Sequence, residues 1–249
     1  MTMLAASHIS RHFGGLRAVD DVSLALQRGE IHAVIGTNGA GKSTLINVLC
    51  GETAPTSGRV EMMGRDITRW SQPKRALAGV GRTYQRTTIF PTLTVHENCR
   101  LSAQARLQKP WSILTPAARC EPSMRAAARA LERTGLATQA DATAATLSHG
   151  AKRQLEIAMC LASAPQILLL DEPLAGMGAQ ETAQMLQLLS ELKNDHAILL
   201  IEHDMDAVFQ VSDRITVMVN GRVLASGTPV AIRGNTEVQQ AYLGEEAPV

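Results

Sequence analysis

The chain has 249 residues, of which 45% are apolar and 19% are charged, so it can build a hydrophobic core and is not disordered by composition. Its 24 basic and 23 acidic residues leave a net charge of +1, and only 3% of the residues are aromatic. This balance gives no electrostatic drive towards nucleic acid and too few rings for a base-stacking surface, so we expect no nucleic-acid partner.

The start of the chain and its cysteines bear on where the protein works. The first residues lack the basic segment and long apolar core of a secretory signal peptide, and no apolar run approaches the ~18–20 residues of a membrane-spanning helix. We therefore expect a protein that is soluble or that reaches a membrane only through a partner. The cysteines are scattered without a Cys-x-x-Cys pair, which is typical of isolated thiols in a reducing compartment. They are Cys50, Cys99, Cys120 and Cys160.

Two strands are predicted near the N-terminus, at residues 4–9 and 22–26, where apolar side chains alternate with polar or small ones in the second segment. Phe13 lies between them and is one of only three phenylalanines. The sequence leaves two interpretations of this ring open. It is either an isolated core residue or a flat surface for an adenine ring.

Residues 36–44, Gly-Thr-Asn-Gly-Ala-Gly-Lys-Ser-Thr, match the phosphate-binding pattern G-x-x-x-x-G-K-[ST]. A buried strand is predicted at 31–35 and a helix from 45 onwards, which is the context that the pattern requires. The glycines let backbone N–H groups turn inward towards a polyphosphate at the helix N-terminus. Lys42 is expected to reach the β- and γ-phosphates, and the Ser43 hydroxyl to hold Mg²⁺. The predicted nucleotide-binding residues of the loop are Gly36, Thr37, Asn38, Gly39, Ala40, Gly41, Lys42, Ser43 and Thr44.

A polar amide follows the next strand-like segments. In chain order the pattern predicts a turn at 51–58, a strand at 59–63, a short helix at 73–78 and a strand at 80–84. Gln85 comes at the end of the last strand. It is either a solvated loop residue or an oxygen ligand of Mg²⁺ that also contacts an attacking water, and spacing alone does not decide between the two.

From about residue 86 to 145 the chain changes character, because prolines interrupt it and helical patterns replace strands. Helices are predicted at 95–106 and 123–134. The segment 108–122 has weak periodicity and is predicted to be loop or short helix. We interpret the whole stretch as a mostly helical insertion between core strands.

A second polar cluster begins at Leu147-Ser148-His149-Gly150-Ala151. Ser148 is a suitable N-cap for a helix that runs to about residue 163. Lys152 and Arg153 lie near the start of this helix, where positive charge opposes the helix dipole unless an anion binds there. Taken by itself, the segment is more typical of an ordinary capped amphipathic helix.

Two buried strands end in charged residues. Four apolar residues at 167–170 lead into Asp171 and Glu172, and strand 197–201 leads into Glu202-His203-Asp204. Ligands of open α/β sheets bind at the carboxyl ends of strands. Asp171 is placed to hold Mg²⁺, Glu172 to orient and deprotonate a water, and His203 to contact a γ-phosphate if the two strands are neighbours.

The last part of the chain has clear punctuation. Asn220-Gly221 between two apolar runs predicts a hairpin with a type I′ turn, and Thr228-Pro229 predicts the N-cap and first residue of a short helix. The other predicted elements are a helix at 180–193, a final helix at 237–243 that ends at Gly244, and a frayed tail at 245–249.

This ordered set of motifs resembles the nucleotide-binding subunit of an ABC transporter over nearly the whole chain. The resemblance implies an α/β fold of one domain, 1–249: a P-loop NTPase core with a mixed β-sheet and an antiparallel β subdomain (1–86 and 164–249), and an inserted α-helical subdomain that carries the signature motif (87–163). By the same resemblance Phe13 is the adenine-stacking aromatic, 36–44 the Walker A loop, Gln85 the Q-loop glutamine, Asp171 and Glu172 the Walker B pair, and His203 the switch histidine.

The signature motif of this family is Leu-Ser-Gly-Gly-Gln, and here it departs from that pattern. His149 replaces a glycine and Ala151 replaces the glutamine, while Ser148 and Gly150 are retained. The resemblance implies that Ser148, His149 and Gly150 face the ATP of a partner subunit. Gly178 also stands where an aspartate is usual, a change that we expect to weaken communication across a dimer.

Five shorter segments resemble the sequences of branched-chain amino acid importers, and urea and short-amide importers are close alternatives. The segments are Arg11–Val19, the Ser148-His149-Gly150 signature, 172–177, 201–205 and 241–245. The resemblance implies ATP and Mg²⁺ as cofactors, a second ATPase subunit that is identical or different, two membrane permeases and a periplasmic solute-binding protein. It also implies a place at the cytoplasmic face of a bacterial inner membrane. A lipid or polysaccharide exporter and a non-transport ABC ATPase are the competing functions.

Overall fold

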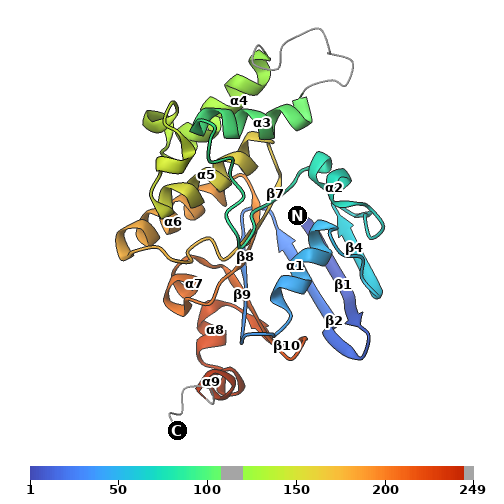
Figure 1. Ribbon diagram of the computed structural model, residues 1–249. Helices are drawn as coiled ribbons and strands as arrows, with labels where there is room; N and C mark the ends of the chain where they lie inside the picture. The colour runs from blue at the N-terminus through green and yellow to red at the C-terminus, as the bar shows by residue number, and fades with distance from the viewer. Residues whose placement is uncertain (108–119, 244–249) are drawn as a thin grey trace.

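Two β-sheets form the body of the molecule in the computed structural model, which describes residues 1–107 and 120–243 (Figure 1). The predictions for 108–119 and for Gly244 and the tail lie outside the described residues. The strands are β1 (Thr2–Phe13), β2 (Leu16–Gln27), β3 (Ile31–Gly36), β4 (Ser57–Met62), β5 (Arg65–Asp66), β6 (Val80–Arg82), β7 (Ile167–Asp171), β8 (Ala197–Ile201), β9 (Arg214–Val219) and β10 (Arg222–Gly227).

The smaller sheet has four strands in the order β2-β1-β4-β5 and is antiparallel throughout. Its first hairpin extends beyond the predicted segments, since β1 and β2 are 12 residues long each. The reason is that β1 is paired on both sides, by β2 and by β4. Backbone pairing therefore continues through polar stretches where the alternation of apolar side chains has ceased.

The larger sheet has six strands in the order β10-β9-β3-β8-β7-β6. Strands β9 to β6 run parallel, and β10 pairs antiparallel with β9. Every residue of β3, β7 and β8 is buried, as expected for parallel strands covered on both faces. The predicted type I′ hairpin is confirmed, because Asn220 and Gly221 have φ values of 48° and 81°.

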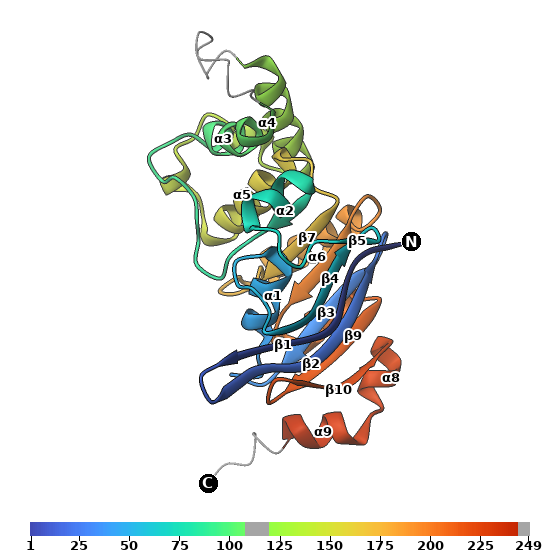
Figure 2. The same cartoon turned by 90° about the vertical axis from the view of Figure 1, so that its right-hand side faces the viewer.

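Helices cover the larger sheet, and those at Val95–Leu107, Glu121–Arg133 and His149–Ala162 form an arm at one end (Figures 1 and 2). The helices are α1 (Lys42–Cys50), α2 (Gln72–Ala78), α3 (Val95–Leu107), α4 (Glu121–Arg133), α5 (His149–Ala162), α6 (Ala179–Leu192), α7 (Met205–Val211), α8 (Pro229–Arg233) and α9 (Thr236–Leu243), with 3-10 turns at Ala137–Gln139 and Ala144–Thr146. Helix α7 was not predicted, although Asp204 caps it by accepting the Ala207 N–H at 3.1 Å. Among the described residues, no helix is both long enough and apolar enough to pass through a bilayer.

Two apolar clusters fill the interior. One lies between the two sheets and around α1, and includes Leu4, Val34 and Leu45. The other lies on the opposite face of the larger sheet and continues into the arm, where Cys99 and Leu131 join it. Because β3, β8, β7 and β6 are parallel neighbours, their carboxyl ends lie at the same edge of the larger sheet.

Candidate functional site

The phosphate loop connects β3 to α1, and the predicted order of strand, loop and helix is confirmed. Two of its glycines are required by close backbone approaches. A Cβ on Gly36 would lie 2.2 Å from the Met218 carbonyl oxygen, and one on Gly41 would lie 2.2 Å from that of Ala18. Gly41 also has a φ of 97°, which L side chains rarely adopt. The loop can thus follow this path only with glycine at both positions.

Lys42 begins α1 and is buried, with its amine turned back onto the loop. Its Nζ donates to the carbonyl oxygens of Gly36 at 2.6 Å and Thr37 at 3.0 Å. Gly41 provides no side chain to cap α1, so the first N–H groups of the helix face the loop. A lysine amine together with uncapped helix N–H groups forms a binding site for phosphate oxygens.

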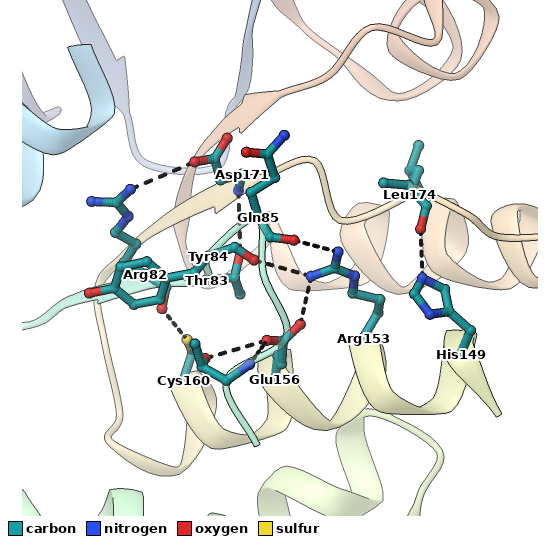
Figure 3. Close-up of polar contacts among 12 residues, drawn as sticks. Arg82, Thr83, Tyr84, Gln85, His149, Arg153, Glu156, Cys160, Asp171 and Leu174 are labelled. Carbon is teal, nitrogen blue, oxygen red and sulfur yellow. Dashed lines mark hydrogen bonds and ion pairs between the residues drawn. The ribbon is translucent and has the colours of Figure 1, made fainter. Parts of the chain in front are cut away.

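Asp171 ends β7 and is only 4% exposed. Burial raises the pKa of its carboxyl group, and the positive charge of Arg82 opposes that rise. Arg82 Nη2 lies 3.6 Å from Asp171 Oδ2 (Figure 3), and Arg82 Nη1 also donates to Glu52 at 2.7 Å. The buried carboxylate is therefore only partly compensated, and a further cation at this point would stabilise its charged form.

Glu172 follows Asp171 and leaves the sheet at a sharp bend with a φ of 50°, unusual for a residue with a side chain. Its N–H donates to the Ile201 carbonyl on β8 at 2.9 Å. Gln85 Nε2 donates to Glu172 Oε2 at 3.1 Å. The structure thus brings together the two residues that the sequence placed 87 positions apart.

His203 follows β8, which pairs directly with β7, so it lies at the same edge as Asp171 and Glu172. Its side chain is 65% exposed, and its Nδ1 lies 3.7 Å from Glu202 Oε2. In the described part of the chain, no hydrogen bond joins the ring to Glu172. Glu202 is buried and accepts the Leu174 N–H at 2.8 Å, and burial raises its pKa.

Phe13 lies at the end of β1 with 48% of its surface exposed, so it is not a core residue. The guanidinium of Arg11 stacks on it at 4.5 Å from the ring centroid. An exposed ring at this place keeps the adenine-stacking interpretation and removes the core alternative.

The signature residues begin α5, and the predicted N-cap is confirmed. Ser148 Oγ accepts the Ala151 N–H at 3.2 Å and donates to Glu181 Oε1 at 3.1 Å. His149 Nε2 lies 2.9 Å from the Ala175 carbonyl oxygen, which ties the signature to the loop after Glu172 (Figure 3). The histidine that departs from the family pattern therefore makes a contact that glycine cannot make.

Sequence reasoning missed the buried Arg153–Glu156 pair one turn further along α5. Arg153 Nη1 lies 2.9 Å from Glu156 Oε2, and its two terminal nitrogens donate to the carbonyls of Tyr84 at 3.1 Å and Gln85 at 2.7 Å. Glu156 accepts the Thr88 N–H at 2.7 Å (Figure 3). The sequence did show the positive charge of Arg153 near the start of the helix. The structure shows that this charge is paired with Glu156 and the carbonyls of Tyr84 and Gln85, so no bound anion is needed to explain it.

Comparison with known proteins agrees with this geometry. The family model described as ABC transporter matches residues 19–175, and the model described as branched-chain amino acid ATP-binding cassette transporter matches residues 222–248. The chain is 43% identical to the high-affinity branched-chain amino acid transport ATP-binding protein LivG of Salmonella typhimurium, with 98% of each covered. BraF, the protein of the same description in Pseudomonas aeruginosa, is 40% identical over 98% of each.

The chain belongs to the ABC transporter family. Solved structures agree: a nucleotide-free ATP-binding cassette of an ABC transporter superimposes with a TM-score of 0.88 at 30% identity, covering 97% of this chain and 99% of that one. The ADP conformation of an ATP-binding cassette of an ABC transporter superimposes with a TM-score of 0.85 at 29% identity, covering 98% of this chain and 99% of that one. As an ABC cassette, the chain binds ATP and couples its hydrolysis to transport.

Proposed function

We propose that this chain is the ATPase subunit of a bacterial importer for branched-chain or other hydrophobic amino acids. The observation that carries the proposal is similarity over the full length to LivG and BraF, whose descriptions name that transport. The separate match at residues 222–248 supports it, because that model describes branched-chain amino acid cassettes in particular.

The site residues fit this activity. ATP would stack its adenine on Phe13 and place its phosphates in loop 36–44. Glu172, oriented by the amide of Gln85, would take a proton from the attacking water. His203, exposed at the same edge, would contact the γ-phosphate.

The donor set also fits Mg²⁺. Ser43 is exposed at the start of α1, Gln85 offers an amide oxygen, and the buried Asp171 carries a carboxylate whose pKa burial raises. Hydroxyl, amide and carboxylate oxygens are the ligands that Mg²⁺ prefers. When bound, the ion would neutralise charge on the β- and γ-phosphates.

Two such subunits would close around ATP, because the resemblance to the family implies that Ser148 and Gly150 face the ATP of a partner subunit. Each ATP would then lie between the loop of one subunit and the signature of the other. The second helix N-terminus adds donors to the γ-phosphate where negative charge develops.

A groove of about 270 Å³ between the sheet and the arm is suited to a membrane permease. It is lined by α2, β6, α3 and α5, including the exposed Leu77 and the buried Glu156. Its floor thus contains the Glu156 end of the network that holds the Gln85 segment. A permease helix bound in this groove would respond to movement of Gln85. The permease would hold the cassette at the cytoplasmic face of the inner membrane. A periplasmic solute-binding protein would act on the cassette through the permease. We further propose that residues 87–163 act as the helical subdomain in this coupling.

The proposed base can be tested directly. Glu172→Gln should retain ATP binding and lower the ATPase rate by about 100-fold or more, because a positioned proton acceptor is lost. Glu237→Gln, an exposed carboxylate on α9, serves as the matched control and should hydrolyse normally. Branched-chain amino acid uptake by vesicles that contain the whole complex should fall with the ATPase rate. Full turnover in Glu172→Gln would remove Glu172 as the base, and transport of an unrelated solute would overturn the substrate.

A further inference from the structure

A carboxylate of the same chain covers the signature residues. Glu181, on the first turn of α6, accepts the Ser148 hydroxyl at 3.1 Å on Oε1 and the Gly178 N–H at 3.4 Å on Oε2. A Cβ built on Gly150 would lie 2.5 Å from both Cδ and Oε1 of Glu181. Glycine at 150 therefore leaves the space into which this carboxylate packs.

Glu181 lies at the N-terminal end of α5, where negative charge is favoured. Helix α5 is 14 residues long, its dipole favours an anion at this end, and the Ser148 hydroxyl donates to the Glu181 carboxylate. A polar cavity of about 180 Å³ adjoins the carboxylate and is lined by Ser148, Gly150, Ala151 and Glu181. Ala151, which stands where the family has glutamine, leaves part of this space open.

We propose that Glu181 competes with ATP for the signature site. In the separate subunit its carboxylate occupies the position that the γ-phosphate of ATP on the opposing subunit takes in the closed dimer. The inference rests on the proposed pairing of two subunits. Beyond that pairing, it identifies Glu181 as a residue that sets the ATP concentration at which two subunits form the closed dimer.

The two anions cannot share the site. Both need the Ser148 hydroxyl, and Glu181 already fills the space over Gly150, so carboxylate and phosphate would repel each other at contact distance. The Glu181 carboxylate can leave Ser148 and move towards Gly178, because it already accepts the Gly178 N–H. A Cβ added to Gly178 would meet nothing within 4 Å, so there is open space beside it. The glycine that replaces the usual aspartate also removes a like charge from that route.

The test uses the full chain in the Glu172→Gln background, in which slowed hydrolysis is expected to let ATP-bound dimers accumulate. ATP is titrated and the dimer fraction is measured by analytical ultracentrifugation. Glu181→Gln keeps the size of the side chain and removes its charge, and Glu181→Ala removes the side chain. Both should lower the ATP concentration for half-maximal dimerisation by about tenfold, a typical effect of removing one charged competitor. Glu191→Gln, an exposed carboxylate on the same helix, should leave it unchanged.

The outcomes separate this inference from the pairing on which it rests. Dimers that form at the same or a higher ATP concentration in both Glu181 variants would overturn the competition and leave the pairing intact. If the background protein binds a fluorescent ATP analogue but forms no dimer at any ATP concentration, the pairing fails and the competition fails with it. Thermal unfolding of each variant shows whether α6 has lost its first turn, and Glu181→Gln remains decisive because glutamine can still accept the Gly178 N–H.

Discussion

Buried polar side chains hold the site at the scale of single residues. Asp171 and Glu202 are both almost fully enclosed, and burial raises the pKa of each. Glu202 is stabilised by two backbone N–H groups, whereas Asp171 depends on Arg82 at 3.6 Å. Asp171, whose negative charge is less fully balanced by protein groups, is the carboxylate proposed to bind Mg²⁺. A carboxylate that is not already neutralised can bind a cation more strongly.

His32 offers a pH-dependent test of the fold. It is buried on β3, with Nδ1 3.2 Å from the Ala25 carbonyl and Nε2 2.8 Å from Thr216 Oγ1. Burial lowers the pKa of His32 from 6.5 to about 4. Between pH 6.5 and 4 the His32 ring is therefore protonated in the unfolded chain but neutral in the folded chain. The stability of the fold is full above pH 6.5 and falls as the pH drops towards 4.

The expected loss at pH 5 relative to pH 7.5 is about 2 kcal/mol from this group. Urea unfolding at both pH values measures it in the wild type and in His32→Asn, which cannot be charged and should show a pH effect smaller by that amount. His8→Asn is the control, because that ring is 79% exposed. An equal pH effect in wild type and His32→Asn would contradict the assignment.

Single residues also show what a sequence can reveal of the site. Lys42, Asp171 and Glu172 could be predicted as site residues because their motifs combine a strand end with charge. Phe13 was left open, since exposure depends on which strands surround it. Arg82 was missed, because an arginine inside a strand has no sequence signal until the fold places Asp171 beside it.

At the scale of elements, α5 links the signature to the Gln85 segment. Its first residue touches the loop after Glu172 through His149, and its second turn holds the backbone of Tyr84 and Gln85 through Arg153. Cys160, about two turns further along, donates to the Arg82 carbonyl at 3.1 Å. One helix thus contacts both the Gln85 segment and the loop after Glu172, on two sides of the candidate site. The length of this helix was predictable, but its partners were not, since they come from β6 and the segment after it.

The Arg153–Glu156 pair should be required for the rate of hydrolysis. Arg153→Met leaves the buried Glu156 without its cation, which costs about 3 kcal/mol of stability, and it releases the carbonyl of Gln85. Gln85 then no longer holds Glu172 in place, so kcat should fall by about tenfold while KM for ATP stays nearly constant, because the phosphate loop is unchanged.

Steady-state ATPase kinetics of the purified complex and urea unfolding measure the two effects. Lys152→Met, on the neighbouring position, is the matched control and should change neither. If Arg153→Met lost stability but kept the wild-type kcat, the pair would be structural only. A large rise in KM with constant kcat would instead place its effect on ATP binding.

The arrangement of the whole molecule lay beyond local pattern. Neighbouring strands β3, β8 and β7 come from residues 31–36, 197–201 and 167–171, so the order of the sheet follows from crossovers that no single segment encodes. The resemblance to the family implied a mixed sheet in advance, but not the order of its strands. What it could not supply is how the departures at His149, Ala151 and Gly178 are accommodated, because those depend on side chains that meet only in this fold.

A site divided between two molecules makes a prediction about mixtures. The Lys42→Ala subunit cannot bind phosphate in its own loop but keeps a functional signature. The Ser148→Ala subunit keeps a functional loop but loses the signature hydroxyl. Loss of that N-cap also lowers its stability by about 1 kcal/mol. Each variant alone should be inactive as a dimer. A dimer of one with the other contains one intact site, formed by the loop of the Ser148→Ala subunit and the signature of the Lys42→Ala subunit.

In an equal mixture half of the dimers are of this mixed kind, so about a quarter of the wild-type ATPase activity should return. The activity of the mixture is measured against the sum of the two variants assayed separately, and two batches of Lys42→Ala mixed together serve as the control. Recovery above the sum requires that both kinds of residue act in one site across an interface between copies of this chain. Activity equal to the sum, in protein shown to dimerise with ATP, would mean that each chain completes its own site. Because Ser148 lies under Glu181 in the separate subunit, adding Glu181→Gln to the Lys42→Ala partner should make the recovered activity appear at a lower ATP concentration.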